Sequence, residues 1–104
     1  MAAVAADLSL PLFVAGRDFA AEMAEHLGTV AGRSIVVDAT GLSSGTSSFA
    51  AELVQRVLVD GKASELIIVG APAQFAEYAH EAAVDGGVAN ALQISREFPV
   101  AARP

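Results

Sequence analysis

A strand and a helix meet in the segment Arg33-Ser-Ile-Val-Val-Asp-Ala-Thr-Gly-Leu-Ser-Ser-Gly-Thr-Ser-Ser-Phe-Ala-Ala-Glu-Leu53. The β-branched run from Ile35 to Val37 is typical of a parallel strand that is covered on both faces. The hydroxyl-rich loop that follows ends where a helical pattern begins. Because the first N–H groups of a helix lack partners and its dipole favours negative charge, this loop is the best candidate for a functional surface.

Outward from this segment, short apolar runs alternate with helical patterns. Apolar runs predict four strands, at 8–14, 34–38, 65–69 and 91–95, and helical patterns predict three helices, at 17–27, 48–60 and 72–85. The order β-α-β-α-β-α-β favours an α/β fold with a four-stranded, largely parallel sheet. Right-handed crossovers restrict the topology, and we expect the strand order 2-1-3-4, counted along the chain. The second and third helices would then cover one face of the sheet and the first helix the other.

The composition indicates one acidic domain. The 104 residues, 54% of them hydrophobic, suffice for one core, which we place at 7–96 with flexible tails at 1–6 and 97–104. A formal net charge of −6 opposes binding to nucleic acid and to anionic membranes. The absence of cysteine excludes disulfides and thiolate metal sites. With no signal peptide and no apolar run of about 18 residues, the sequence predicts a cytoplasmic protein without metal or cofactor.

One motif suggests an enzyme instead. The stretch Gly41-Leu42-Ser43-Ser44-Gly45 matches the G-x-S-x-G pattern of serine hydrolases, and Asp60 and His80 follow in the chain order of their catalytic residues. In those enzymes the helix starts at the serine, whereas the apolar stripe here begins only at Phe49. Because so short a pattern arises easily by chance in a loop rich in glycine and serine, a small serine hydrolase is the less favoured alternative.

Three stretches of the chain carry a recognisable pattern. They are Ile35-Val-Val-Asp38, Ser47-Ser-Phe-Ala-Ala-Glu-Leu53 and, upstream, Gly16-Arg-Asp-Phe-Ala-Ala-Glu-Met23. Together they resemble the STAS-like domain family, a shorter variant of the domains typified by anti-sigma-factor antagonists, over roughly residues 8 to 95. The resemblance implies a non-enzymatic domain that associates with histidine-kinase-type ATPase modules or anti-sigma-type proteins.

In the wider STAS group, a serine at the start of the helix after this strand is phosphorylated. Counted from Asp38, that position corresponds to Ser47, with Ser48 next, so the resemblance implies these two serines as phosphorylation candidates. Thr46 and Phe49 stand where the motif of that group has aspartate and glycine. The alternative from the residues alone is that Asp38 binds N–H groups of the loop while Ser47 or Ser48 caps the helix.

These observations together predict a regulatory domain of a bacterial switch that acts by contact with a protein partner. The contact residues would surround the start of the second helix: Asp38, Ser43, Ser44, Thr46, Glu52, Gln55 and Arg56. Phosphorylation there would repel the partner by adding negative charge. The alternative is a self-associating structural module without a switch, because a single helix over one face would leave apolar surface for a second copy.

Overall fold

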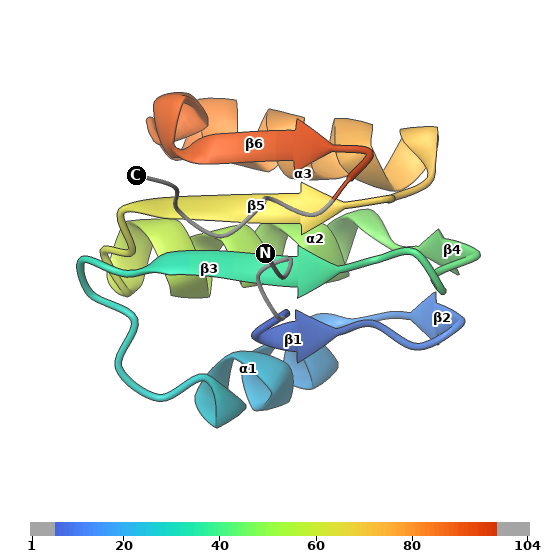
Figure 1. Ribbon diagram of the computed structural model, residues 1–104, viewed down its shortest axis with the longest axis horizontal. Helices are drawn as coiled ribbons and strands as arrows, with labels where there is room; N and C mark the ends of the chain where they lie inside the picture. Colours follow the sequence, from blue (N-terminus) through green and yellow to red (C-terminus); the bar gives the residue numbers. More distant parts are fainter. Residues whose placement is uncertain (1–5, 98–104) are drawn as a thin grey trace, which may run out of the picture.

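Four parallel strands form the central sheet of the computed structural model, which describes residues 6–97 (Figure 1). They are β1 (Leu8–Ser9), β3 (Ser34–Asp38), β5 (Glu65–Val69) and β6 (Leu92–Ser95). Three helices alternate with them: α1 (Arg17–His26), α2 (Ser47–Val54) and α3 (Ala73–Asp85). The predicted α/β fold with a four-stranded parallel sheet is therefore confirmed. Apart from Ala6 and Glu97, the predicted tails lie outside the described residues.

Two predicted elements are divided. The first apolar run forms β1 and then a separate strand, β2 (Phe13–Val14), which pairs in parallel with β4 (Ser44–Gly45) in a small second sheet. The second helix continues beyond α2 as a π-helical segment, η1 (Gln55–Asp60). A short 3-10 turn, η2 (Ala89–Ala91), leads into β6. The hydroxyl loop is thus tied to the chain that follows β1 and not to the central sheet alone.

The strand order of the central sheet is β1-β3-β5-β6, so the four strands lie in their order along the chain. The predicted order 2-1-3-4 was wrong. It placed the first strand inside the sheet, between two hydrogen-bonded neighbours. Pro11 lacks a backbone N–H, and the strand ends before it at Ser9, so β1 suits an edge position, where it pairs with β3 alone.

All three helices lie on the same face of the sheet, behind it in the view of Figure 1. Each right-handed crossover moves to the next strand in the same direction, so each helix packs on the same side. One core cluster accordingly contains Ala20 of α1, Leu53 of α2 and Ala79 of α3. The predicted division of the helices over both faces was wrong, and within residues 6–97 the opposite face carries no helix.

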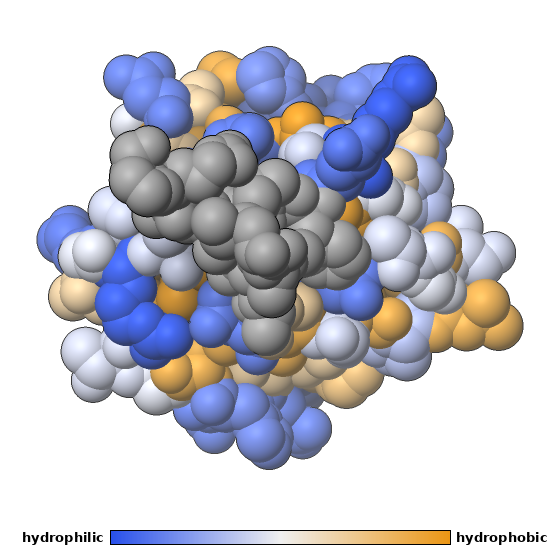
Figure 2. All heavy atoms as spheres, in the orientation of Figure 1, coloured by the Kyte–Doolittle hydropathy of each residue, from blue (hydrophilic) through white to orange (hydrophobic). Residues whose placement is uncertain are grey.

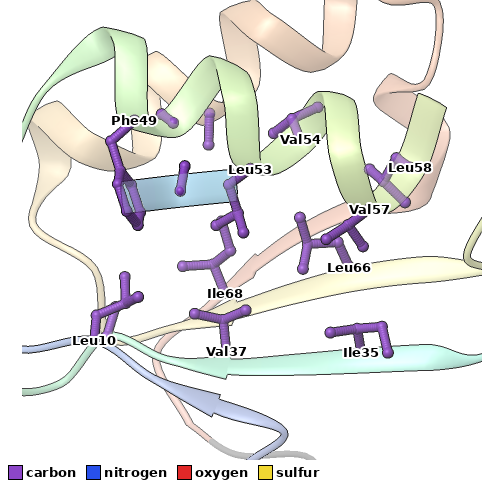
Figure 3. Close-up of a cluster of buried hydrophobic side chains, with 14 of the residues drawn as sticks. Leu10, Ile35, Val37, Phe49, Leu53, Val54, Val57, Leu58, Leu66 and Ile68 are labelled. Atoms are coloured by element: carbon purple, nitrogen blue, oxygen red, sulfur yellow. The ribbon is translucent and has the colours of Figure 1, made fainter. Parts of the chain in front are cut away.

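The core lies between α2 and the sheet (Figure 3). Phe49 and Leu53 extend from the helix toward strand residues such as Ile68. The buried ring of Phe49 also has aromatic neighbours in the other two helices, with centroid distances of 5.7 Å to Phe19 and 6.1 Å to Phe75. Phe49 therefore anchors the first turn of α2, and with it the loop that precedes this helix.

Candidate functional site

The hydroxyl loop, residues 39–46, leaves the carboxyl end of β3 and is held against the chain around β2. The Ser43 N–H donates to the Leu12 carbonyl oxygen at 2.7 Å, and the Thr46 N–H donates to the Val14 carbonyl oxygen at 3.1 Å. Between these bonds, Phe13 is paired with Ser44. Parallel α/β sheets bind their ligands outside the carboxyl ends of the strands, so the loop lies at the edge suited to recognition.

Two large hydrophobic side chains are exposed beside this loop. Leu12 and Phe13 expose 69% and 56% of their surface, and Ser43, Ser44 and Ser47 are exposed as well. Figure 2 shows hydrophobic atoms at the end of the molecule where Figure 1 places β2 and β4. We call these five residues the contact surface. Exposed apolar side chains that are rimmed by polar groups are typical of a protein-binding site.

The carboxylate of Asp38 lies inside the loop and shapes it. Its Oδ1 accepts hydrogen bonds from the Thr40 N–H at 2.9 Å and from the Thr40 hydroxyl at 2.6 Å. This is the loop-capping arrangement that the sequence offered as the alternative to partner contact. The role of Asp38 in this structure is therefore to fix the path of the loop from β3 toward the contact surface.

Thr46, and neither of the two serines after it, caps α2. Its hydroxyl oxygen accepts hydrogen bonds from the Phe49 N–H and from the Gly16 N–H, each at 3.2 Å. The prediction that Ser47 or Ser48 is the cap was wrong, because the helix begins one residue after Thr46. Ser48 is partly buried, with its hydroxyl 3.1 Å from that of Thr46, whereas Ser47 is exposed. Ser47 is thus the more accessible phosphorylation candidate.

Glu52 and Arg56, two predicted contact residues, are paired with each other on the outer face of the helix. Glu52 Oε2 lies 2.7 Å from Arg56 Nε, and its Oε1 lies 3.2 Å from Nη1 of Arg17 at the start of α1. The hydrogen bond from Arg56 lowers the pKa of the Glu52 carboxyl; partial burial opposes this effect and Arg17 adds to it. Glu52 is therefore ionised at neutral pH and links the first two helices.

A shallow open depression of about 240 Å³ lies beside the start of α2. Ser47 and Ser48 line it together with Arg17, Tyr78 and Glu81. Gln55, another predicted contact residue, lines a neighbouring depression of about 360 Å³, and its amide also donates to Asp60 at 3.0 Å. A phosphate on Ser47 would therefore lie near one arginine, Arg17, and two carboxylates, those of Glu81 and Asp85.

The residues of the hydrolase motif are spread over the fold. Ser44 belongs to β4, and α2 begins only at Ser47, so the motif forms no sharp turn from strand to helix. Asp60 is the last residue of η1 and lies about 20 Å along the helix from the start of α2. His80 lies exposed on α3. The structure does not bring the serine, the aspartate and the histidine of the motif together.

Two absences hold for the described part of the chain, residues 6–97. No cluster of histidine, aspartate and glutamate side chains is arranged to hold a metal ion there. No helix in this range combines the length and the apolar character needed to cross a bilayer.

The sequence analysis missed Leu12, Phe13 and Arg17 as site residues. Leu12 and Phe13 were counted within the single predicted strand at 8–14, although Pro11 directly before them was the available signal that this strand stops and restarts. Arg17 opens α1, and its proximity to Ser47 and Glu52 depends on how two helix starts meet. No local pattern reports such a tertiary contact.

Comparison with family models, with curated proteins and with solved structures finds no match. The likeness to STAS-like domains therefore rests on the three stretches of sequence alone. What the fold adds is geometry: an exposed apolar pair, a loop held by backbone hydrogen bonds and an exposed serine at a helix start.

Proposed function

We propose that this protein is a non-enzymatic interaction domain of STAS-like type that docks a protein partner through the contact surface. The partner is a histidine-kinase-type ATPase or an anti-sigma-type protein of a bacterial, cytoplasmic switch. The observation that carries this proposal is the exposure of Leu12 and Phe13 beside a loop fixed by backbone hydrogen bonds. A rigid, partly apolar surface can bind a partner without first being ordered, which reduces the entropic cost of association.

The energetics favour these two side chains as the anchors of the interface. Full burial of a Leu or Phe side chain is worth about 1.5–3 kcal/mol, and a tenfold change in affinity corresponds to about 1.4 kcal/mol. The hydroxyl groups of Ser43 and Ser44 at the rim contribute specificity by hydrogen bonding more than affinity. Phe13 is therefore expected to be the energetic centre of the contact surface.

Replacing Phe13 by serine is expected to weaken partner binding by about tenfold or more, because the ring loses its burial in the complex. The measurement is a calorimetric titration with a histidine-kinase-type ATPase module. Val84→Ser is the matched control, because Val84 on α3 is similarly exposed, at 54%, but lies outside the contact surface. Equal affinities of the two variants and the unaltered chain would contradict the proposal.

The same variants separate the switch from the self-associating module. If the ATPase does not bind and sedimentation shows a dimer of the unaltered chain that Phe13→Ser dissociates, the contact surface serves a second copy. If the unaltered chain stays monomeric and binds the ATPase, the proposed heteromeric contact is supported. Melting curves should be nearly superimposable for Phe13→Ser and the unaltered chain, since the ring is exposed in the free protein.

Phosphorylation of Ser47 is the proposed control of this contact. Ser47 is the first residue of α2, where a phosphate is compatible with the helix dipole and does not remove the Thr46 cap. The added charge must be desolvated when a partner covers the surface, and Glu81 beside the same depression gives it an acidic neighbour. Phosphorylation should thus leave the fold intact and weaken the complex.

Replacing Ser47 by aspartate is expected to weaken binding to the ATPase several-fold relative to Ser47→Ala, with little change in melting temperature for either variant. Ser47→Ala controls for loss of the hydroxyl group. The experiment also measures phosphate transferred by the ATPase to the unaltered chain and to Ser47→Ala. Equal affinity for the two variants, with no transfer to Ser47, would remove the phosphorylation switch and leave the Phe13 contact untouched.

A further inference from the structure

A shallow groove runs between α2 and α3 on the side of the helices that faces away from the sheet. The two helices pack side by side, behind the sheet in Figure 1. The two depressions of about 240 Å³ and about 360 Å³ lie between them and share Ala51 of α2 with Ala82 and Asp85 of α3 as lining residues. We call the two depressions together the helix groove. Side chains as small as alanine leave room for another helix to approach both walls closely.

The α3 wall of the helix groove is acidic. Glu81 and Asp85 line the groove, and Glu77 precedes them at the same spacing, so exposed carboxylates follow one stripe of α3. Like charges at a spacing of four residues repel one another along a helix. Within residues 6–97, none of the three carboxylates forms an ion pair. The α3 wall therefore favours a partner that brings positive charge.

The opposite wall supplies little of that charge. Arg17 lines both depressions, but its Nη1 donates to Glu52 Oε1 at 3.2 Å, so its charge is already paired. Ser47 and Gln55 of the same wall are neutral. The carboxylates of α3 thus face a wall that leaves them without a partner of opposite charge.

An aromatic ring lies in the same groove. Tyr78 is partly buried and lines the smaller depression together with Glu81. An arginine side chain binds carboxylates through its planar array of N–H groups and also stacks on aromatic rings. Two carboxylates beside an aromatic ring therefore suit arginine better than lysine.

We propose that the helix groove docks a basic helix of a protein partner, whose arginine side chains face the acidic stripe of α3. Positions four residues apart lie about 6 Å apart along a helix, so arginines at this spacing match the successive carboxylates. Ala51 and Ala82 allow the partner helix to lie between α2 and α3. The helix groove adjoins the contact surface at Ser47, and its role does not depend on the function proposed for that surface.

Tyrosine fluorescence measures this binding, because Tyr78 is the only tyrosine and the chain has no tryptophan. The probe is an alanine-rich helical peptide with arginine at every fourth position and no aromatic residue, titrated at low ionic strength. The double variant Glu81→Gln, Asp85→Asn should bind it about fivefold more weakly, because two ion pairs are lost. Glu22→Gln, Glu25→Gln is the matched control, since it removes the same charge from exposed positions of α1 and should change the affinity by less than about twofold.

Two single substitutions separate docking in the groove from diffuse attraction between charges. Ala51→Leu fills the helix groove without changing the charge and should weaken binding by about tenfold or more. Ser47→Asp adds a carboxylate to the groove and should tighten peptide binding by about twofold, opposite in sign to its expected effect on the ATPase complex. Phe13→Ser should leave peptide binding unchanged, and melting curves show whether each variant is folded.

Four results would overturn the docking of a basic helix. They are an unchanged Tyr78 emission in the presence of the peptide, equal weakening by the two double variants, full affinity of Ala51→Leu, and equal binding of a peptide with glutamine in place of arginine. The absence of an ATPase complex would change none of these measurements, so the two proposed surfaces fail or hold separately.

Discussion

Replacing Phe49 by alanine is expected to lower the free energy of unfolding by about 3–5 kcal/mol. The ring is completely buried, with aromatic neighbours from α1 and α3, and it points from the first turn of α2 toward the sheet (Figure 3). The loss combines the transfer free energy of the ring with the cavity that remains where the three helices meet. The higher helix propensity of alanine offsets only about 0.5 kcal/mol of this.

Urea denaturation followed by circular dichroism measures this loss through the shift of the midpoint at constant slope. Phe13→Ala is the matched control, because it removes the same ring from a position that is 56% exposed, and we expect it to cost less than about 1 kcal/mol. If both variants unfold at the same urea concentration, the packing of α2 on the sheet is not as the structure shows it.

The two inner strands could be predicted from the sequence with their observed bounds. Ser34–Asp38 and Glu65–Val69 are continuous apolar runs closed by polar residues or glycine, which is a local signal. What covers each face of these strands is not local. Val36 and Ile67 are as apolar as the residues under the helices, so their composition predicted helices on both faces, whereas within residues 6–97 the opposite face carries none.

The strand order was predictable in part. Pro11 in the first apolar run already indicated a weakly paired strand, and an edge position follows from that observation. The predicted order 2-1-3-4 contradicted it.

The candidate site was also predictable only in part. The hydroxyl loop could be located because its serine and threonine residues directly precede a helical pattern. The exposure of Phe13, however, depends on the pairing of β2 with β4. Pairing between segments about 30 residues apart leaves no trace in either segment.

The end of η1 provides a second test of the structure, because Gly61 is the residue at which the π-helical segment stops. An added Cβ at Gly61 would lie 2.5 Å from the carbonyl oxygen of Arg56, 2.8 Å from that of Val57 and 2.6 Å from a methyl group of Val30. Two of these atoms belong to the backbone, so they cannot move away by rotating a side chain. The wide π-helical turn brings these carbonyl oxygens against Gly61.

Replacing Gly61 by alanine is therefore expected to lower the free energy of unfolding by about 1–3 kcal/mol, measured by the same urea denaturation. A glycine whose φ suits alanine would ordinarily gain about 0.4–1 kcal/mol from this substitution, because the unfolded chain loses freedom, and Gly61 has such a φ, at −78°. The close contacts are what reverse the sign. Gly41→Ala is the control, since its added Cβ meets nothing nearer than the Leu10 carbonyl oxygen at 3.8 Å, and it should be neutral or slightly stabilising. A stabilised Gly61→Ala protein would show that the helix does not end in this π-helical turn, and that Arg56 and Glu52 on it are not held where the structure places them.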